Sequence, residues 1–259
     1  MTSLQRAGVV LKALLWDVDG TLAETERDGH RPAFNRAFAD AGLPLHWSCE
    51  GYEPWLAISG GQERIAGQLR QLLGREPDPQ QVRALQSAKQ RHYRQLVQQG
   101  AVQLRPGVRR LLREAHQAEL TQVIVTTSGR SAVAALLDQL LGPLQQVFAF
   151  WICGEDVSRK KPDPEAYLLA SRQLLERGAI RSSAELLVIE DSRNGLAAAQ
   201  AAALSCLVSL SHYGSTEVLG DPQGAAAVVD QLGSGASVLL GPPCQTPELT
   251  LSYLQALLA

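Results

Sequence analysis

The chain has 259 residues, 45% of them apolar, and 24 basic residues nearly balance 26 acidic ones. That length fits one large domain, or a core domain that carries a smaller insertion, with ample apolar material for a packed interior. The balanced charge, without a long basic block, argues against a nucleic-acid partner. No apolar run approaches the roughly 20 residues that span a bilayer, so no membrane partner is expected either.

The four cysteines lie far apart in the chain, and no C-x-x-C pair occurs. This spacing argues against a disulfide framework or a structural zinc site and favours reduced thiols. The residues before Gly8 are too few for the apolar region of a secretory signal. We therefore expect a soluble monomer in the cytoplasm, or in the plastid stroma if a transit segment has been removed.

The first predicted element is a buried strand. Its apolar run starts at Val9 and closes with Leu15-Trp16, directly before Asp17-Val18-Asp19-Gly20-Thr21. No second strand follows at once, because residues 24–103 are patterned as successive helices, one of which places Phe34 and Phe38 four residues apart. These residues are predicted to form a helical insertion behind the first strand.

Beyond the insertion, helices and short apolar strands alternate. An amphipathic helix over 108–118 leads into a strand over 123–125. The further predicted strands are 148–152, 186–189 and 206–210, with helices over 132–141, 164–175 and 195–203 between them. A last short strand is expected within 225–232, followed by a Gly/Pro-rich connector over 233–247 and a final helix. Continuous apolar strands in such an alternation are typical of a parallel sheet covered on both faces.

The predicted fold class is therefore α/β, with a Rossmann-like three-layer core around a central parallel sheet and a small all-helical cap domain inserted after the first strand. Residues 1–23 and 104–259 form the predicted core domain, and residues 24–103 form the cap. In an open parallel sheet, ligands bind beyond the carboxyl ends of the strands. The residues that follow each strand are thus the candidate site.

Polar and charged residues follow four of the predicted strands. They are Asp17 and Asp19 after the first, Thr126, Thr127 and Ser128 after the second, Lys161 after the third, and Glu190 and Asp191 after the fourth. Acidic pairs, hydroxyl groups and a lysine at one rim suit a phosphate together with a hard divalent cation such as Mg²⁺, which prefers oxygen ligands. A carboxylate there can attack phosphorus, with the cation and the lysine offsetting the repulsion between the two anions.

Asp17, the first acid, is the predicted nucleophile. Asp19 lies two residues on, on the same side of an extended strand, and is predicted to protonate the leaving oxygen and then to activate water. Taken singly, each motif has a plainer interpretation as a turn, a helix cap, a solvated basic loop or a helix-terminal charge. Their order and spacing together favour the catalytic interpretation.

The motifs Asp17-Val18-Asp19-Gly20-Thr21, Thr126, Lys161-Pro162 and Glu190-Asp191 resemble the four motifs of the haloacid dehalogenase superfamily, over about residues 11–232. The resemblance implies that Asp17 is the nucleophile and Asp19 the acid and base. It implies that Thr126 and Lys161 bind the transferred phosphoryl group. It also implies a Mg²⁺ site formed by Asp17, the backbone carbonyl of Asp19, Glu190 and Asp191.

The predicted cap narrows the resemblance to one group. The run from Leu22 to Arg31, together with Trp47, Tyr52 and Ser59 to Ile65, is similar to the CbbY group, whose members look like xylulose-1,5-bisphosphate phosphatases that remove an inhibitor of Rubisco. A cap of this kind can close over the site and exclude water. The resemblance therefore implies a phosphoric monoester hydrolase that acts on a sugar (bis)phosphate through an aspartyl-phosphate intermediate.

A bisphosphate substrate needs a second anion site away from the nucleophile. The cap residues predicted to bind substrate are His30, Arg31 and Arg64 for this anion, and Glu24 and Tyr52 for sugar hydroxyl groups. Each has a simpler interpretation, as a solvated helix residue or, for His30, as a packed imidazole.

Two alternatives share the core motifs. In a sugar-phosphate mutase of the β-phosphoglucomutase type, the phosphoryl group returns from Asp17 to a sugar instead of to water. A regulatory protein with this fold would bind phosphate without turnover, although all four motif positions are occupied here. Gln62 stands where the family often has Lys, so one expected positive charge is missing from the cap and the preferred sugar phosphate is left open.

Overall fold

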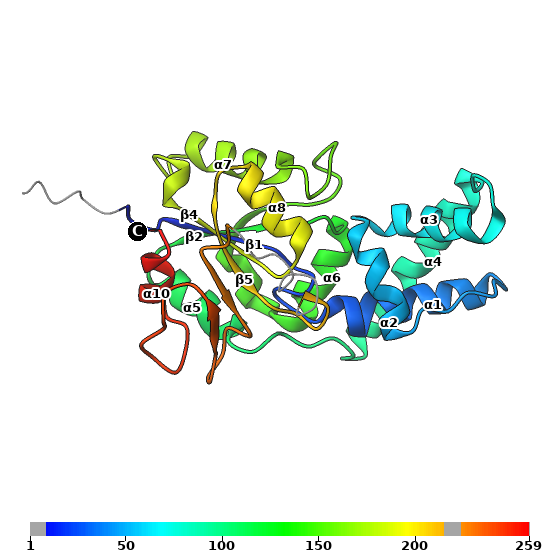
Figure 1. The fold of residues 1–259 in the computed structure, drawn as a ribbon, viewed down its shortest axis with the longest axis horizontal. Helices are drawn as coiled ribbons and strands as arrows, with labels where there is room; N and C mark the ends of the chain where they lie inside the picture. Colours follow the sequence, from blue (N-terminus) through cyan, green and yellow to red (C-terminus); the bar gives the residue numbers. More distant parts are fainter. Residues whose placement is uncertain (1–8, 215–223, 259) are drawn as a thin grey trace, which may run out of the picture.

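A central sheet organises the computed structural model, which describes residues 9–214 and 224–258 (Figure 1). Within these residues the strand order is β3-β2-β1-β4-β5-β6-β7, and all neighbours are parallel except the antiparallel pair β6 and β7. The strands are β1 Ala13–Trp16, β2 Thr121–Val125, β3 Phe148–Ile152, β4 Leu186–Glu190, β5 Ser205–Ser209, β6 Ala227–Val229 and β7 Val238–Leu240. The predicted α/β class with a largely parallel sheet is confirmed.

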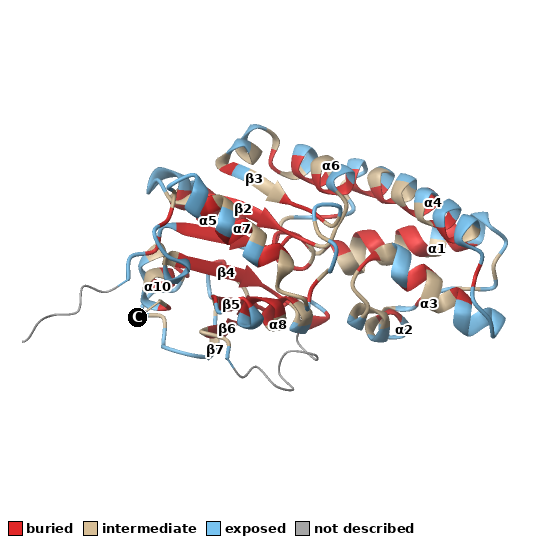
Figure 2. Cartoon of the chain, turned by 90° about the horizontal axis from the view of Figure 1, so that it is seen from above, coloured by how far each residue is buried: buried red, intermediate tan, exposed pale blue. Residues whose placement is uncertain are grey.

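Helices cover both faces of the sheet, which explains its continuously apolar strands. Alternate residues of β1 show the two sides: Leu14 and Trp16 face one apolar cluster, and Ala13 and Leu15 face the other. The first cluster includes α5 Val108–Gln117, α6 Arg130–Leu140 and α10 Leu251–Ala256, and the second includes α7 Glu165–Glu176 and α8 Arg193–Ala201. Figure 2 shows the buried central strands β1, β2, β4 and β5 between helices that are exposed on their outer sides. Single 3-10 segments, Gly142–Val147 and Ser183–Glu185, precede β3 and β4.

Two parts of the core differ from the prediction. The apolar run before β1 is not strand along its whole length, because Val9 and Val10 lie outside the sheet and are 37% and 53% exposed. Within the predicted Gly/Pro-rich connector, Val238–Leu240 forms the edge strand β7 against β6. Three residues are too few to show the alternation of apolar and polar residues that marks a strand, so the sequence pattern does not indicate this one.

A helical lobe lies between β1 and α5 in the chain, beside the sheet (Figure 1). Its elements are a π-helical turn Glu26–His30, α1 Arg31–Asp40, α2 Cys49–Tyr52, a 3-10 segment Glu53–Ala57, α3 Gly61–Leu73 and α4 Pro79–Gln98. This helical insertion after the first strand is as predicted. Neither here nor elsewhere in the described ranges is a helix long and apolar enough to cross a membrane.

Aromatic side chains fill the interior of the lobe. The ring centroids of Phe34 and Phe38 lie 5.0 and 5.1 Å from that of Trp47, in edge-on contacts. Tyr213, from the segment after β5, joins this interior. Conversely, Tyr93 near the end of α4 belongs to the apolar cluster under the sheet. Because α4 contributes to both interiors, the division at residues 24 and 103 into two domains stays a prediction.

Replacing Phe38 by Ala should lower the free energy of unfolding by about 3–5 kcal/mol, because the side chain is fully buried and its loss leaves a cavity. Urea unfolding followed by tryptophan fluorescence measures the change. Arg36→Ala, at an exposed position of the same helix, is the control and should cost less than about 0.5 kcal/mol. Equal effects of the two substitutions would contradict an aromatic interior in the lobe.

Candidate functional site

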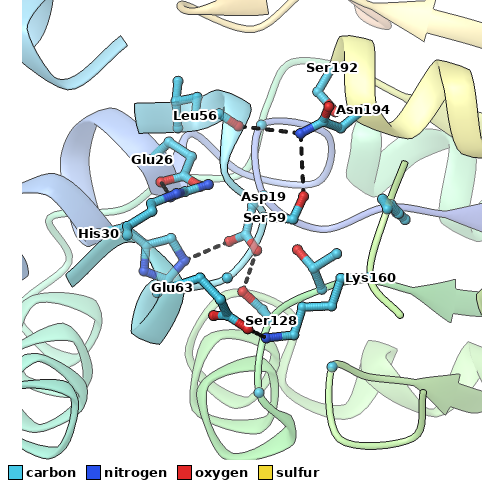
Figure 3. Close-up of a pocket in the computed structure, with 18 of the residues that line it drawn as sticks. Asp19, Glu26, His30, Leu56, Ser59, Glu63, Ser128, Lys160, Ser192 and Asn194 are labelled. Atoms are coloured by element: carbon cyan, nitrogen blue, oxygen red, sulfur yellow. Dashed lines mark hydrogen bonds and ion pairs between the residues drawn. The ribbon is translucent and has the colours of Figure 1, made fainter. Parts of the chain in front are cut away.

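The residues that follow β1, β2 and β4 meet because these strands are neighbours. The strand order reverses at β1: the chain runs from β1 outward through β2 to β3 and then returns to β4 on the other side of β1. Ligands bind at such reversal points, beyond the carboxyl ends of the strands. Here the lobe closes the opposite side and leaves a cavity of about 360 Å³ with walls from both parts of the chain (Figure 3).

Three buried carboxylates form the floor of the site. Asp17, Glu190 and Asp191 each offer an oxygen atom, and these atoms all lie within 4.8 Å of one another. Burial, followed by the charge of Glu190, raises the pKa of Asp17 and that of Asp191 well above the usual value. Carboxylates held this closely out of water need positive charge between them, and the set fits a hard divalent cation.

Lys161 supplies one positive charge within the acidic group. Its Nζ donates to Asp17 Oδ1 at 2.7 Å, to Glu190 Oε1 at 2.6 Å and to the Val125 carbonyl at 2.7 Å. Burial opposes the charged form, but the two carboxylates outweigh it and raise the pKa of Lys161 above its usual value. The ammonium is therefore charged, and three acceptors fix its position.

Two glycines explain how the carboxylates fit against the backbone. Gly20 has a φ of +85°, and a Cβ there would lie 1.9 Å from Asp191 Oδ2. At Gly195, in the first turn of α8, a Cβ would lie 1.9 Å from Glu190 Cδ. Any side chain at either position would displace a carboxylate of the group.

Asp19 lies apart from the three acids and is bound by three polar groups. Its Oδ1 accepts from Thr25 Oγ1 at 2.6 Å. The same oxygen lies 2.9 Å from His30 Nε2, and Oδ2 accepts from Ser128 Oγ at 2.5 Å (Figure 3). Burial alone would raise the pKa of Asp19, yet His30 and the two hydroxyl groups hold it below the usual range. Asp19 is thus an anion in this arrangement. Its part in a metal site, through the backbone carbonyl, stays a prediction.

Two of the hydroxyl groups after β2, those of Thr126 and Ser128, have hydrogen-bond partners within the protein. Thr126 is buried, and its Oγ1 accepts the backbone N–H of Ser128 at 3.1 Å. The hydroxyl of Ser128 donates to Asp19. Thr127 and Ser128 line the cavity, whereas Thr126 lies behind its wall. The phosphoryl contacts predicted for these residues stay predictions, and backbone N–H groups or a rearranged hydroxyl would have to make them.

The five cap residues predicted to bind substrate divide into two groups. Those that line the cavity are Glu24, His30 and Arg64, and those outside its lining are Arg31 and Tyr52. Arg31, half-buried on α1, donates to the carbonyl of Trp47 at 3.2 Å. Tyr52 is fully buried in the lobe interior. Arg31 and Tyr52 thus contact other parts of the lobe in this structure, and their predicted contact with the substrate stays a prediction.

Arg64 forms a buried ion pair with Glu26. Its Nη1 lies 2.9 Å from Glu26 Oε1 and 2.6 Å from the Tyr52 hydroxyl, and its Nε donates to the Ile58 carbonyl at 2.8 Å. Burial would raise the pKa of Glu26, but the charge of Arg64 outweighs burial and lowers it. The guanidinium thus has a carboxylate of its own and adds little uncompensated charge to the cavity.

Glu24 is held at the junction between lobe and sheet. Its Oε1 lies 3.3 Å from Arg105 Nε and accepts the backbone N–H of His212 at 3.3 Å. Arg105, itself buried, also donates to the carbonyls of Gly20 and Ser209 at 2.7 and 2.9 Å. The sequence motifs do not single out Arg105. Its contacts join Gly20 and Glu24, at the start of the lobe, to Ser209 at the end of β5.

Two contacts that the sequence analysis missed join the lobe to the sheet across the cavity (Figure 3). Lys160 Nζ lies 2.5 Å from Glu63 Oε1, and the Asn194 amide donates to Ser59 Oγ at 3.3 Å. The partners are 97 and 135 residues apart in the chain, so no local pattern indicates them.

Lys89 is a further cavity residue that the sequence analysis missed. It lies on α4, is 3% exposed, and places Nζ 2.8 Å from His30 Nδ1. One signal could have found it, because Lys89 stands four residues after Leu85 and four before Tyr93, on the apolar side of a predicted helix. A charge in that position is unusual unless it has a partner or a ligand.

Comparison with known proteins identifies the family. The model of haloacid dehalogenase-like hydrolases matches residues 11–203. Protein CbbY of Rhodobacter capsulatus is 41% identical over 204 residues, which are 78% of this chain and 87% of that protein. CbbY of Rhodobacter sphaeroides, crystallised with phosphate, superposes with a TM-score of 0.76 at 37% identity and covers 86% of this chain and 95% of its own. A variant of that protein in complex with xylulose-1,5-bisphosphate matches with the same score and coverage at 36% identity. The chain therefore belongs to the haloacid dehalogenase-like hydrolases, and it is a phosphatase of the CbbY type.

Proposed function

We propose that this chain is a Mg²⁺-dependent phosphatase of xylulose-1,5-bisphosphate, and that it protects Rubisco from this inhibitor in the cytoplasm or the plastid stroma. The observation that carries the proposal is the contact of Lys161 with the buried acids Asp17 and Glu190, beside Asp191, in a cavity of a size usual for small molecules. The complex of the R. sphaeroides protein with that sugar supports the choice of substrate.

Asp17 is the proposed nucleophile. One of its oxygens attacks phosphorus while the bond between phosphorus and the sugar oxygen breaks, which moves the phosphoryl group to Asp17. The Lys161 ammonium, 2.7 Å from Asp17 Oδ1, reduces the repulsion between the two anions. Mg²⁺ held by Asp17, Glu190, Asp191 and the Asp19 carbonyl would add positive charge beside the phosphate oxygens.

Asp19 is the proposed acid and base. To protonate the leaving sugar oxygen it must first carry a proton, whereas His30 and the hydroxyl groups around it favour the anion. The acid step therefore requires that Asp19 exchange at least one of these contacts for the leaving oxygen. The anion is suited to the second step, in which Asp19 takes a proton from the water that hydrolyses the aspartyl-phosphate.

Release of inorganic phosphate from a panel of sugar phosphates tests the substrate. We expect kcat/KM for xylulose-1,5-bisphosphate to exceed that for ribulose-1,5-bisphosphate and for glucose phosphates by at least about tenfold. The reason is that a sugar with differently placed hydroxyl groups leaves polar groups of the cavity without a hydrogen-bond partner, which weakens its binding. An isomerised sugar phosphate formed without free phosphate would indicate a mutase. No turnover of any phosphate ester with Mg²⁺ would favour a phosphate-binding regulatory protein.

The substitution Asp17→Asn should lower kcat by at least about 1,000-fold, because it removes the attacking oxygen. The melting temperature should stay the same or rise, since one of three repelling acids becomes neutral. Asp138→Asn, at an exposed position on α6, is the control and should keep wild-type rates. Appreciable phosphate release by Asp17→Asn would remove Asp17 from the nucleophile role.

Removal of divalent cations by EDTA should reduce phosphate release to background and also lower the melting temperature. A cation at 100 times its Kd stabilises the folded state by about 2.7 kcal/mol, provided that it does not bind the unfolded chain. Thermal unfolding with and without added Mg²⁺ measures this effect independently of activity. Asp191→Asn should weaken the stabilisation, and an unchanged effect in that variant would place the cation elsewhere.

A further inference from the structure

The basic side chains around the cavity differ in one respect, which is whether a carboxylate contacts them. Arg64 contacts Glu26, Lys160 contacts Glu63, and Lys161 contacts Asp17 and Glu190. His30 contacts Asp19. Among the cavity-lining cations in residues 9–214 and 224–258, only Lys89 has no carboxylate contact. The substrate proposed above brings two phosphates, and the acidic group with Lys161 accounts for one of them.

The surroundings of Lys89 leave donors free for a ligand. An ammonium has three N–H groups and no acceptor, so His30 Nδ1 accepts one hydrogen bond from Lys89 and Nε2 donates to Asp19. The rings of Phe34 and Tyr93 lie beside the same ammonium, at 4.7 and 5.2 Å from Nζ to the centroids. Burial lowers the pKa of Lys89 to about 8, because the charges of Glu26 and Asp19, neither in contact with it, offset the cost of desolvation only in part. A bound anion would reverse this effect.

Two glutamines flank Lys89 on the cavity side of α4. Gln86 and Gln90 both line the cavity, and their Oε1 atoms are buried without a hydrogen-bond partner in the described part of the chain. A buried amide oxygen without a donor is unfavourable and is suited to accept from a hydroxyl group of a ligand. The amide of Gln86 lies against Gly61, where an added Cβ would come within 3.0 Å of Oε1.

The start of α3 adds a second feature that favours an anion here. Residues 60–64 all line the cavity, and α3 begins at Gly61 without a side-chain cap on its first N–H groups. Gln62, in this same turn, carries no charge. Arg64, also in this turn, is paired with Glu26. A phosphate at this place therefore needs a cation from another helix, and among the cavity-lining cations of the described residues Lys89 of α4 is the one without a carboxylate contact.

We propose that Lys89 binds the phosphate group of the substrate that does not react, and that Gln86 and Gln90 accept hydrogen bonds from sugar hydroxyl groups beside it. The inference rests on the bisphosphate substrate proposed above. It assigns the second anion site to α4 and moves it away from Arg31 and Arg64. One imidazole ring, that of His30, separates this site from Asp19.

Binding of xylulose-1,5-bisphosphate to the Asp17→Asn variant, measured by calorimetry in the presence of Mg²⁺, tests the proposal without turnover. Adding Lys89→Met should weaken binding about 10- to 100-fold, the range of a hydrogen bond to a charged group. Lys89→Arg should restore part of the loss, because the charge returns. Arg91→Met, at an exposed position of the same helix, is the matched control and should leave the Kd within about twofold.

Rates of phosphate release distinguish a loss of recognition of the second phosphate from general damage to the site. In the background with Asp17, Lys89→Met should reduce kcat/KM for the bisphosphate at least about tenfold more than for the monophosphates of the same sugar, which lack the second anion. Gln86→Met and Gln90→Met should raise KM without changing this ratio of bisphosphate to monophosphate, because they contact hydroxyl groups that all these substrates share.

Four outcomes would overturn the inference. Equal losses for bisphosphate and monophosphates in Lys89→Met would show that Lys89 serves only to position His30. Loss of the bisphosphate preference in Lys160→Met but not in Lys89→Met would place the second anion at Lys160. If the Asp17→Asn protein with intact Lys89 bound no bisphosphate at all, the proposed function would fail together with the inference. If adding Lys89→Met left the affinity for the bisphosphate unchanged, the inference alone would be wrong.

Discussion

One buried ammonium between two carboxylates is the contact on which the site depends. Lys161 Nζ lies 2.7 Å from Asp17 and 2.6 Å from Glu190, and all three side chains are buried. Withdrawing these acids from water is unfavourable, and their mutual repulsion adds to the cost. Positive charge from the lysine offsets part of both effects, and a bound cation would add to it. In the proposed reaction, the same charges would attract a phosphate to the place where Asp17 can attack it.

The parallel sheet makes this contact possible. Trp16 of β1 is in register with Ile124 of β2 and Ile189 of β4, so the three strands end at the same level and their following residues meet at one edge. Glycines at positions 20 and 195 leave the space that two of the carboxylates occupy. Backbone topology therefore sets the distances between the groups, and the side chains supply the charges.

The lobe provides the remaining half of the cavity, and α4 sets its position relative to the sheet. This helix contributes to the aromatic interior of the lobe and, through Tyr93, to the apolar cluster beneath the sheet. Lys89 lies between these two packed regions and reaches Asp19 through His30. A ligand bound to the lobe would thus contact groups whose hydrogen bonds continue to the proposed acid and base of the reaction.

The charged groups at the strand ends could be predicted from the sequence, whereas the contacts of the cap side chains could not. Asp17, Lys161 and the pair Glu190-Asp191 each follow a strand with a clear apolar run, and adjacent parallel strands bring them to one edge. Arg31 and Arg64 are alike in the sequence, since both lie on helices of the cap. The structure pairs Arg64 with Glu26, 38 residues away, and directs Arg31 to the backbone of Trp47.

The sequence by itself determined the fold class, the helical insertion and the identity of the charged groups at the strand ends, because these depend on patterns among residues close together in the chain. Only the tertiary structure decided which cations of the cavity have a carboxylate partner among the described residues and which of them, Lys89, does not. Ion pairs form between helices brought together from distant positions, and their geometry depends on packing that no local pattern records.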